Sequence, residues 1–169
     1  MSEDNVAASR RLLEDGFNKG NLAVGDEIIA ADAVSHDPAE TPELRALRGP
    51  EVFKRTVSMY RAAFPDLRLT IEDAFGDGDK VVVRWRCEGT HRGELAGLAP
   101  TGVHAVITGI AIDRYENGKI AESWAEWDNL GLARQIGAAP PEGSRGERVG
   151  AMMQHLTARR MRRRAGAVA

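Results

Sequence analysis

The segment SWAEWDNLGLARQIG, residues 123–137, brings carboxylates and tryptophans together at the end of a predicted strand. Asp128 follows Trp127 and stands where the strand gives way to a helix-like pattern. A carboxylate held against an aromatic wall is partly desolvated, so its proton affinity rises and it becomes a usable general acid or base. Aspartate is also a favoured N-cap, so the spacing alone leaves open that Asp128 caps the helix that follows.

Alternation along this strand decides which side chains share a face. Residues on one face of a strand differ by two, which groups Glu122, Trp124, Glu126 and Asp128 against the odd-numbered positions. If the even face looks into a cavity beneath the helices, Trp124 and Asp128 point toward its interior.

Two histidines stand before turns or loops, His36 in VSHDP and His91 in GTHRGE. A neutral imidazole can orient a carbonyl group or accept a proton near physiological pH, although either residue could instead be a surface histidine or one bonded to backbone. His36, His91 and Asp128 lack the compact spacing of a metal site, so we predict no metal. Nucleotide-binding and hydrolase motifs are also missing from the sequence, which leaves cofactor-free acid/base chemistry, or binding without chemistry.

In the first part of the chain, the elements that position these residues are predicted to be helices. Apolar residues at helical spacing predict amphipathic helices over residues 3–19 and from Pro50 to Phe64, with a shorter helix over 22–31. Residues 34–50 contain three prolines and are typical of a loop.

From residue 67 the apolar period changes from helical to alternating. The segments LRLTIEDAF, VVVRWRCEGTH, HAVITGIAIDRY and KIAESWAEWD predict four strands, the last two joined by an Asn-Gly hairpin. Cys87 lies in the apolar alternation, where we expect a small buried core residue. Helices followed by hairpin-linked strands predict an α+β fold, with helices on one face of an antiparallel sheet.

The chain divides into a main domain, residues 1–137, and a linker with a basic helix or tail, residues 138–169. The tail holds seven arginines and two glutamates, whereas residues 1–137 hold 16 basic and 23 acidic side chains, so their net charges are +5 and −7. The arginines are not interleaved with aromatic residues, so we expect no nucleic-acid partner. An amphipathic helix through Val149, Met152 and Leu156 would dock on a second subunit or remain disordered. The polar N-terminus and the lack of a long apolar run predict a cytoplasmic protein with no membrane partner.

The segments SHDP, FPD, GDKVVVRWRCEGTHRGEL, PTG and RYENGKIAESWAEWDNLGLARQIG, in this order, carry a resemblance that covers about residues 3–137. The chain resembles the SnoaL-like polyketide cyclase family of the nuclear-transport-factor-2-like superfamily. The resemblance implies a cone-shaped α+β barrel, with a pocket between a curved sheet and its helices, that commonly dimerises through the sheet. It also implies closure of the last ring of an aromatic polyketide by intramolecular aldol condensation, without metal or cofactor.

The position of the family's catalytic aspartate matches Asp128, so the resemblance favours Asp128 facing the pocket, whether or not it also caps the helix. The family also uses polar side chains, including a histidine, on the strand before the hairpin, where this chain offers only Thr108 and Arg114 on the even face. Our leading hypothesis gives proton abstraction to Asp128 and polarisation or reprotonation of the oxygen to His91 or His36. We expect the substrate to be a small hydrophobic or aromatic molecule. The residues predicted to bind it are Trp124, Trp85, Tyr60 and Arg114.

Two other functions are open at this point. The first is an epoxide hydrolase or ketosteroid isomerase of the same superfamily. An epoxide hydrolase would need an Asp-Arg-Asp site, and Asp113, Arg114 and Asp128 supply these residue types. Asp113 and Arg114 are consecutive, however, and so point to opposite faces of one strand. The other is a non-catalytic module that binds a small hydrophobic ligand, since fold does not determine function.

Overall fold

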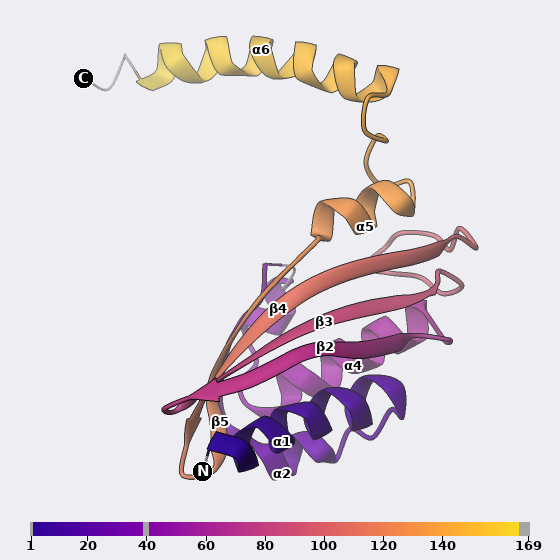
Figure 1. Cartoon of the computed structure of the whole chain (residues 1–169). Coiled ribbons are helices and arrows are strands. Elements are labelled where there is room, and N and C mark those ends of the chain that lie inside the picture. The colour runs from indigo at the N-terminus through magenta and orange to yellow at the C-terminus, as the bar shows by residue number, and fades with distance from the viewer. Residues whose placement is uncertain (1, 39–40, 166–169) are drawn as a thin grey trace.

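The computed structural model describes residues 2–38 and 41–165 (Figure 1). Met1, residues 39–40 and residues 166–169, the last four of the predicted tail, lie outside the described residues. Helices come first and most of the strands follow, which confirms the predicted α+β class. The helices lie on one face of a curved sheet that does not close into a barrel (Figure 1).

The helical layer contains one long helix at each end. Its elements are α1 (Ser2–Leu13), the π-helical turn η1 (Glu14–Asn18), α2 (Val24–Ile28), α3 (Pro42–Arg45) and α4 (Pro50–Ala63). Acidic side chains in the first turn of α1 and arginines in its last turn complement the helix dipole. Pro50 begins α4 at a position where its missing N–H leaves no hydrogen bond unmade.

The sheet has five strands in the order β1-β5-β4-β3-β2. They are β1 (Ile29–His36), β2 (Arg68–Asp77), β3 (Lys80–Thr90), β4 (His104–Glu116) and β5 (Lys119–Trp127). All neighbouring pairs from β2 to β5 are antiparallel, as the hairpin-length connections predict.

The edge strand β1 was not predicted, and it pairs in parallel with β5. The sequence pattern instead predicts a helix over residues 22–31 and a loop over residues 34–50. The reason is the missing alternation: Ile29 and Ala33 are the buried residues of β1, but Ala31 between them is exposed, so the apolar pattern that marks the other strands is absent. An irregularity between Ile29 and Val34 in the pairing with β5 breaks the alternation.

A second irregularity reverses the expected faces of β5. Tyr115 pairs with Ile120 whereas Arg114 pairs with Glu122, so Ala121 is an extra residue on β5. Beyond this bulge the odd-numbered residues face the helices and the even-numbered residues face outward. The expectation that the even face of β5 looks into the cavity is therefore wrong.

Two clusters of buried apolar side chains join the helices to the sheet. The first packs α1 and α2 against Val81, Val83 and Ile120, and the second packs the end of α4 against Leu69 and Cys87. Cys87 is buried, as expected, and its burial raises the pKa of the thiol to about 12. Leu13, Ile71 and Trp85 contact both clusters, so the clusters meet in the middle of the domain.

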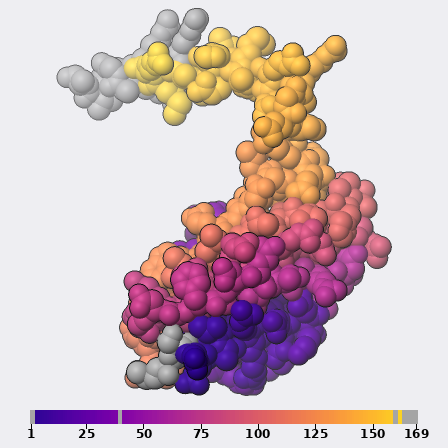
Figure 2. All heavy atoms as spheres, viewed as in Figure 1, coloured from indigo at the N-terminus to yellow at the C-terminus, as the bar shows by residue number. Residues whose placement is uncertain are grey.

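Two helices follow the sheet, and only the first packs against the domain. Helix α5 (Asn129–Gln135) contacts β4, and Leu132 and Ile136 belong to the second apolar cluster. Helix α6 (Arg145–Ala165) stands clear of the domain in the space-filling view (Figure 2). Among the described residues, no helix has both the length and the hydropathy that a bilayer crossing requires.

Candidate active site

A cavity of about 180 Å³ lies between the helices and the sheet. Its wall is mainly apolar and aromatic, with contributions from α1, α4 and all five strands. Two of the predicted wall residues, Trp85 and Tyr60, line this cavity, whereas Trp124 and Arg114 are not among its lining residues. Ligand pockets usually measure roughly 300–1,000 Å³, so a fused polycyclic ligand would have to extend through the mouth or displace side chains.

Asp113 is the carboxylate that lines the cavity from β4, and it is 6% exposed. The Ser9 hydroxyl of α1 donates to its Oδ2 at 2.8 Å, and the Ser123 hydroxyl of β5 donates to its Oδ1 at 2.7 Å. Ser9 Oγ also lies 2.8 Å from the hydroxyl of Tyr115. Burial raises the pKa of Asp113, and the two serine hydrogen bonds oppose that rise.

A second carboxylate, Asp37, lies where the cavity meets the surface. Asp37 lines both the cavity and an outer groove, which also share Val34 and Ser35. The indole Nε1 of Trp127 donates to Asp37 Oδ1 at 3.1 Å, and Trp127 makes an edge-to-face contact with Tyr60 at 6.1 Å between ring centroids. Burial, and then the charge of Asp37, raise the pKa of Tyr60. Asp37, Tyr60 and Trp127 therefore form the mouth of the cavity.

Asp128 is the N-cap of α5. Its Oδ1 accepts a hydrogen bond from the backbone N–H of Gly131 at 2.7 Å. It lines a shallow outer groove together with Ile110 and Glu126, and it is not among the residues that line the cavity. The helix-cap interpretation therefore describes its contacts in this structure, and a catalytic role for Asp128 stays a prediction.

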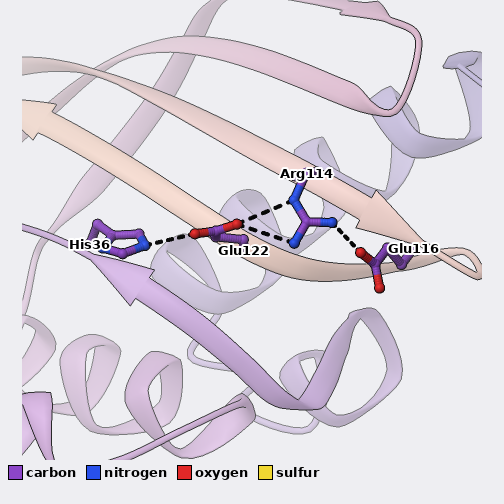
Figure 3. A network of polar contacts seen from close by, with 4 residues as sticks. All are labelled: His36, Arg114, Glu116 and Glu122. Carbon is purple, nitrogen blue, oxygen red and sulfur yellow. Dashed lines mark hydrogen bonds and ion pairs between the residues drawn. The ribbon is translucent and has the colours of Figure 1, made fainter.

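His36 belongs to a polar network on the outer face of the sheet (Figure 3). Its Nε2 lies 2.9 Å from Oε1 of Glu122, whose Oε2 accepts from Arg114, and Arg114 also pairs with Glu116. The His36 ring stacks on Trp124, with 5.4 Å between centroids. The hydrogen bond from His36 and then that from Arg114 lower the pKa of Glu122. His36, Trp124 and Arg114 thus come together, but outside the cavity.

His91 is fully buried at the start of the loop between β3 and β4. Its ring stacks on Phe64 at 5.2 Å, and its Nδ1 lies 3.2 Å from Thr101 Oγ1. Its backbone N–H donates to Val103, so both ends of the loop are held together. The Nε2 atom has no hydrogen-bond partner among the described residues, and His91 does not line the cavity.

The residues of the Asp-Arg-Asp alternative do not come together. Asp113 faces the cavity, Arg114 is paired with glutamates on the outer face, and Asp128 caps α5. Within residues 2–38 and 41–165, no three His, Cys, Asp or Glu side chains gather as metal ligands would.

The sequence contained a signal for Asp113 that was used only for the epoxide hydrolase alternative. Asp113 is the one acidic residue in the apolar run VITGIAID and shares its face with Ala111, which also lines the cavity. Opposite Asp113 on β5 stands Ser123, a hydroxyl donor. Asp37 follows His36 in VSHDP, and only the histidine of this pair was predicted as a site residue.

Known proteins are similar to this chain in both sequence and fold. The model of the SnoaL-like polyketide cyclase family matches residues 7–136. Aklanonic acid methyl ester cyclase of Streptomyces galilaeus is 33% identical over 144 residues, which are 84% of this chain and 96% of that protein. IdmH of Streptomyces antibioticus is 33% identical, with a TM-score of 0.64 over 80% of this chain and 97% of its own. TsrD of Streptomyces laurentii is 30% identical, with a TM-score of 0.67 over 78% and 96%. The chain belongs to the SnoaL-like polyketide cyclase family.

Proposed function

We propose that the chain is a cofactor-independent, polyketide cyclase-like enzyme that closes a ring by intramolecular aldol condensation or related carbon-acid chemistry. Family membership and the 33% identity to a cyclase support this reaction class. The observation that carries the proposal is Asp113, a carboxylate buried in the wall of an otherwise largely apolar cavity.

The reaction requires only proton transfers and one new carbon–carbon bond. A base removes a proton from the carbon next to a carbonyl, and the resulting enolate attacks a second carbonyl carbon of the same molecule. The alkoxide that forms then takes up a proton. This aldol addition releases no water, so substrate and product are isomers. One carboxyl group that accepts the first proton and returns it to the alkoxide completes the cycle.

Asp113 has the properties that this cycle requires. Burial raises its pKa, and a carboxylate with a raised pKa is a stronger base toward a carbon acid. The hydroxyls of Ser9 and Ser123 hold both carboxyl oxygens and fix the orientation of the group. The apolar wall around it would bind the rings of an aromatic or other small hydrophobic substrate.

The mouth residues would act on the substrate's oxygens. Tyr60 is protonated at neutral pH and is a hydroxyl donor there, and burial and then the charge of Asp37 raise its pKa further. At the mouth it would orient a substrate carbonyl. The outer groove shared with Asp37 would receive the part of a larger substrate that exceeds the cavity.

The test compares Asp113→Asn with Asp128→Asn, because the sequence favours Asp128 and the geometry favours Asp113. Aldol closure leaves mass unchanged, so ring closure is followed by chromatography and NMR with aromatic polyketide substrates. Incorporation of solvent deuterium next to the carbonyl, read by mass spectrometry, reports the base alone. We expect Asp113→Asn to lower both rates about 10²–10⁴-fold while substrate binding persists.

Each outcome separates the candidates. Asp128→Asn should retain both rates, because asparagine is also a good N-cap. Full turnover by a folded Asp113→Asn variant would refute the proposed base, and loss confined to Asp128→Asn would transfer the role to Asp128. Binding without exchange or conversion in the wild-type protein would instead identify a non-catalytic ligand-binding module.

A further inference from the structure

Helix α6 presents an apolar face that its own domain does not cover. Val149, Met152, Met153 and Leu156 are spaced as one face of a helix, and each is 53–61% exposed. Arg145 stands one turn before Val149 and extends the same face with a positive charge. Methionines adapt to irregular partner surfaces, so this composition favours contact with a protein.

The start of α6 is anchored, which gives the helix a direction. The Ser144 hydroxyl caps it by accepting the Glu147 N–H at 3.2 Å, and Glu147 pairs with Arg134 of α5. Figure 1 shows α6 beyond β4, with the sheet between it and helices α1 and α2. From this anchor α6 runs back across the width of its own domain with a gap between the two, so its apolar face is available to another molecule (Figure 2).

The outer face of the sheet carries a groove of matching chemistry. The groove measures about 490 Å³ and is lined by Ile110, which is 46% exposed, with Glu126 and Asp128 beside it. Its arginine, Arg84, is already paired with Glu72. Glu126 makes no ion pair with the described residues, so the groove offers an apolar floor and uncompensated negative charge.

We propose that α6 is an arm that binds this groove, the one lined by Ile110, Glu126 and Asp128, on a second copy of this chain. The apolar face of α6 would pack on Ile110, and its arginines would approach Glu126 and Asp128. The charges favour this occupant, because residues 138–169 carry +5 and residues 1–137 carry −7. The apolar face of α6 includes no residue of the proposed active site. The groove lies outside the Asp113 site, but it shares Trp127 with the cavity and Glu126 with the groove that Asp37 lines, so the groove variant is assessed by self-association alone.

A photo-crosslinking residue placed at Met152 of the full chain tests the contact directly. Equal amounts of ¹⁴N- and ¹⁵N-labelled protein are mixed, so that a cross-link between copies carries both labels and one within a copy carries a single label. We expect mixed-label cross-links to β4 or β5 around Ile110 and Glu126. The control places the same residue at Gln154, two positions from both Met152 and Leu156 and thus on the opposite face of α6.

Charge variants supply the energetic test. Met152→Glu/Leu156→Glu should raise the dissociation constant for self-association about ten-fold or more in analytical ultracentrifugation, whereas Gln154→Glu should change it less than about two-fold. Glu126→Lys should weaken self-association in the same way. Cross-links within one copy only, or unchanged self-association in these variants, would overturn the proposal. Flotation with anionic phosphatidylserine vesicles that the double variant abolishes, without mixed-label cross-links, would assign the arm to a lipid surface instead.

Discussion

Asp113 is the carboxylate that the proposed mechanism uses as its base. Its carboxyl is desolvated by the apolar wall and held by two hydroxyl donors, so its pKa results from opposing effects of which burial is the larger. The same balance makes Asp113 costly to ionise in the folded protein. In the proposed mechanism its protonation would link catalysis to stability.

Removal of one serine donor should shift the pH dependence of activity. Hydrogen bonds from Ser9 and Ser123 favour the carboxylate, so Ser123→Ala should raise the pKa of Asp113 further. Hydrogen bonds to charged groups contribute about 1.5–3 kcal/mol, which corresponds to about one to two pH units. The limb of the kcat/KM profile that reports the base should move to higher pH by this amount. An unmoved limb would show that another group is the base.

Asp113→Asn should also change how stability depends on pH. An aspartate whose native pKa lies above its unfolded value contributes its full stability below the unfolded pKa and loses it as the pH rises through the native pKa. Wild type therefore carries a destabilising ionisation at neutral and alkaline pH that the variant lacks. The melting temperature of Asp113→Asn relative to wild type should be higher at pH 8 than at pH 4. A constant difference across this range would contradict a raised pKa.

At the scale of elements, irregular pairing explains where sequence patterns succeed and fail. Strands β2 to β5 and helix α4 follow their apolar periods closely enough to be predicted. β1 could not be predicted, because Ala31, between the buried Ile29 and Ala33, is exposed and the segment shows no apolar alternation. The bulge at Ala121 has no clear signal in the sequence, yet it exchanges the faces of β5 and so brings Ser123 to Asp113 while placing Trp124 outside. Trp85 and Tyr60 were predicted as wall residues and line the cavity. Trp85 keeps its predicted face because the irregularity opposite it places the extra residue on β2 and not on β3.

Gly109 of β4 allows the aromatic wall to assemble. It pairs with Trp85 on one side and Trp127 on the other, and a Cβ there would lie 2.4 Å from Trp85 Cζ2 and 2.7 Å from Trp127 Cβ. Both tryptophans would have to move, so Gly109→Ala should destabilise the protein by about 1–3 kcal/mol. Chemical denaturation measures the loss. Gly118→Ala is unsuitable as a control because of its positive φ, whereas Gly150→Ala adds a methyl group in open space and should be neutral or stabilising.

The cap of α5 offers a separate measurement on Asp128. Asp128→Ala removes the acceptor for the Gly131 N–H and should cost about 0.5–2 kcal/mol, whereas Asp128→Asn should recover most of that loss. Urea denaturation of the three proteins gives the comparison. Equal losses in both variants would mean that the negative charge itself, and not the hydrogen-bond acceptor, stabilises this end of the helix.

At the scale of the whole molecule, the domain and the arm use different parts of the chain. Both apolar clusters draw every member from residues up to Ile136, and every residue that lines the cavity lies before Asp128. Helix α6 contributes to neither. The proposed base Asp113 and the proposed groove for a second copy thus lie on opposite faces of one sheet, and variants of the apolar face of α6 should spare the chemistry.

A chain that ends after Gly137 separates these two roles. Because α6 adds nothing to either apolar cluster, the shortened chain should unfold cooperatively with a melting temperature within about 4 °C of the full chain, the shift that about 1 kcal/mol produces. Arg134 loses its contacts with Glu142 and Glu147, but it becomes accessible to water and therefore costs little. Solvent deuterium incorporation into substrate should persist, whereas self-association should weaken as in Met152→Glu/Leu156→Glu. Calorimetry and ultracentrifugation on the same samples test both expectations. Loss of cooperative unfolding would show that the domain extends beyond residue 137, and unchanged self-association would place the contact between copies on the sheet alone.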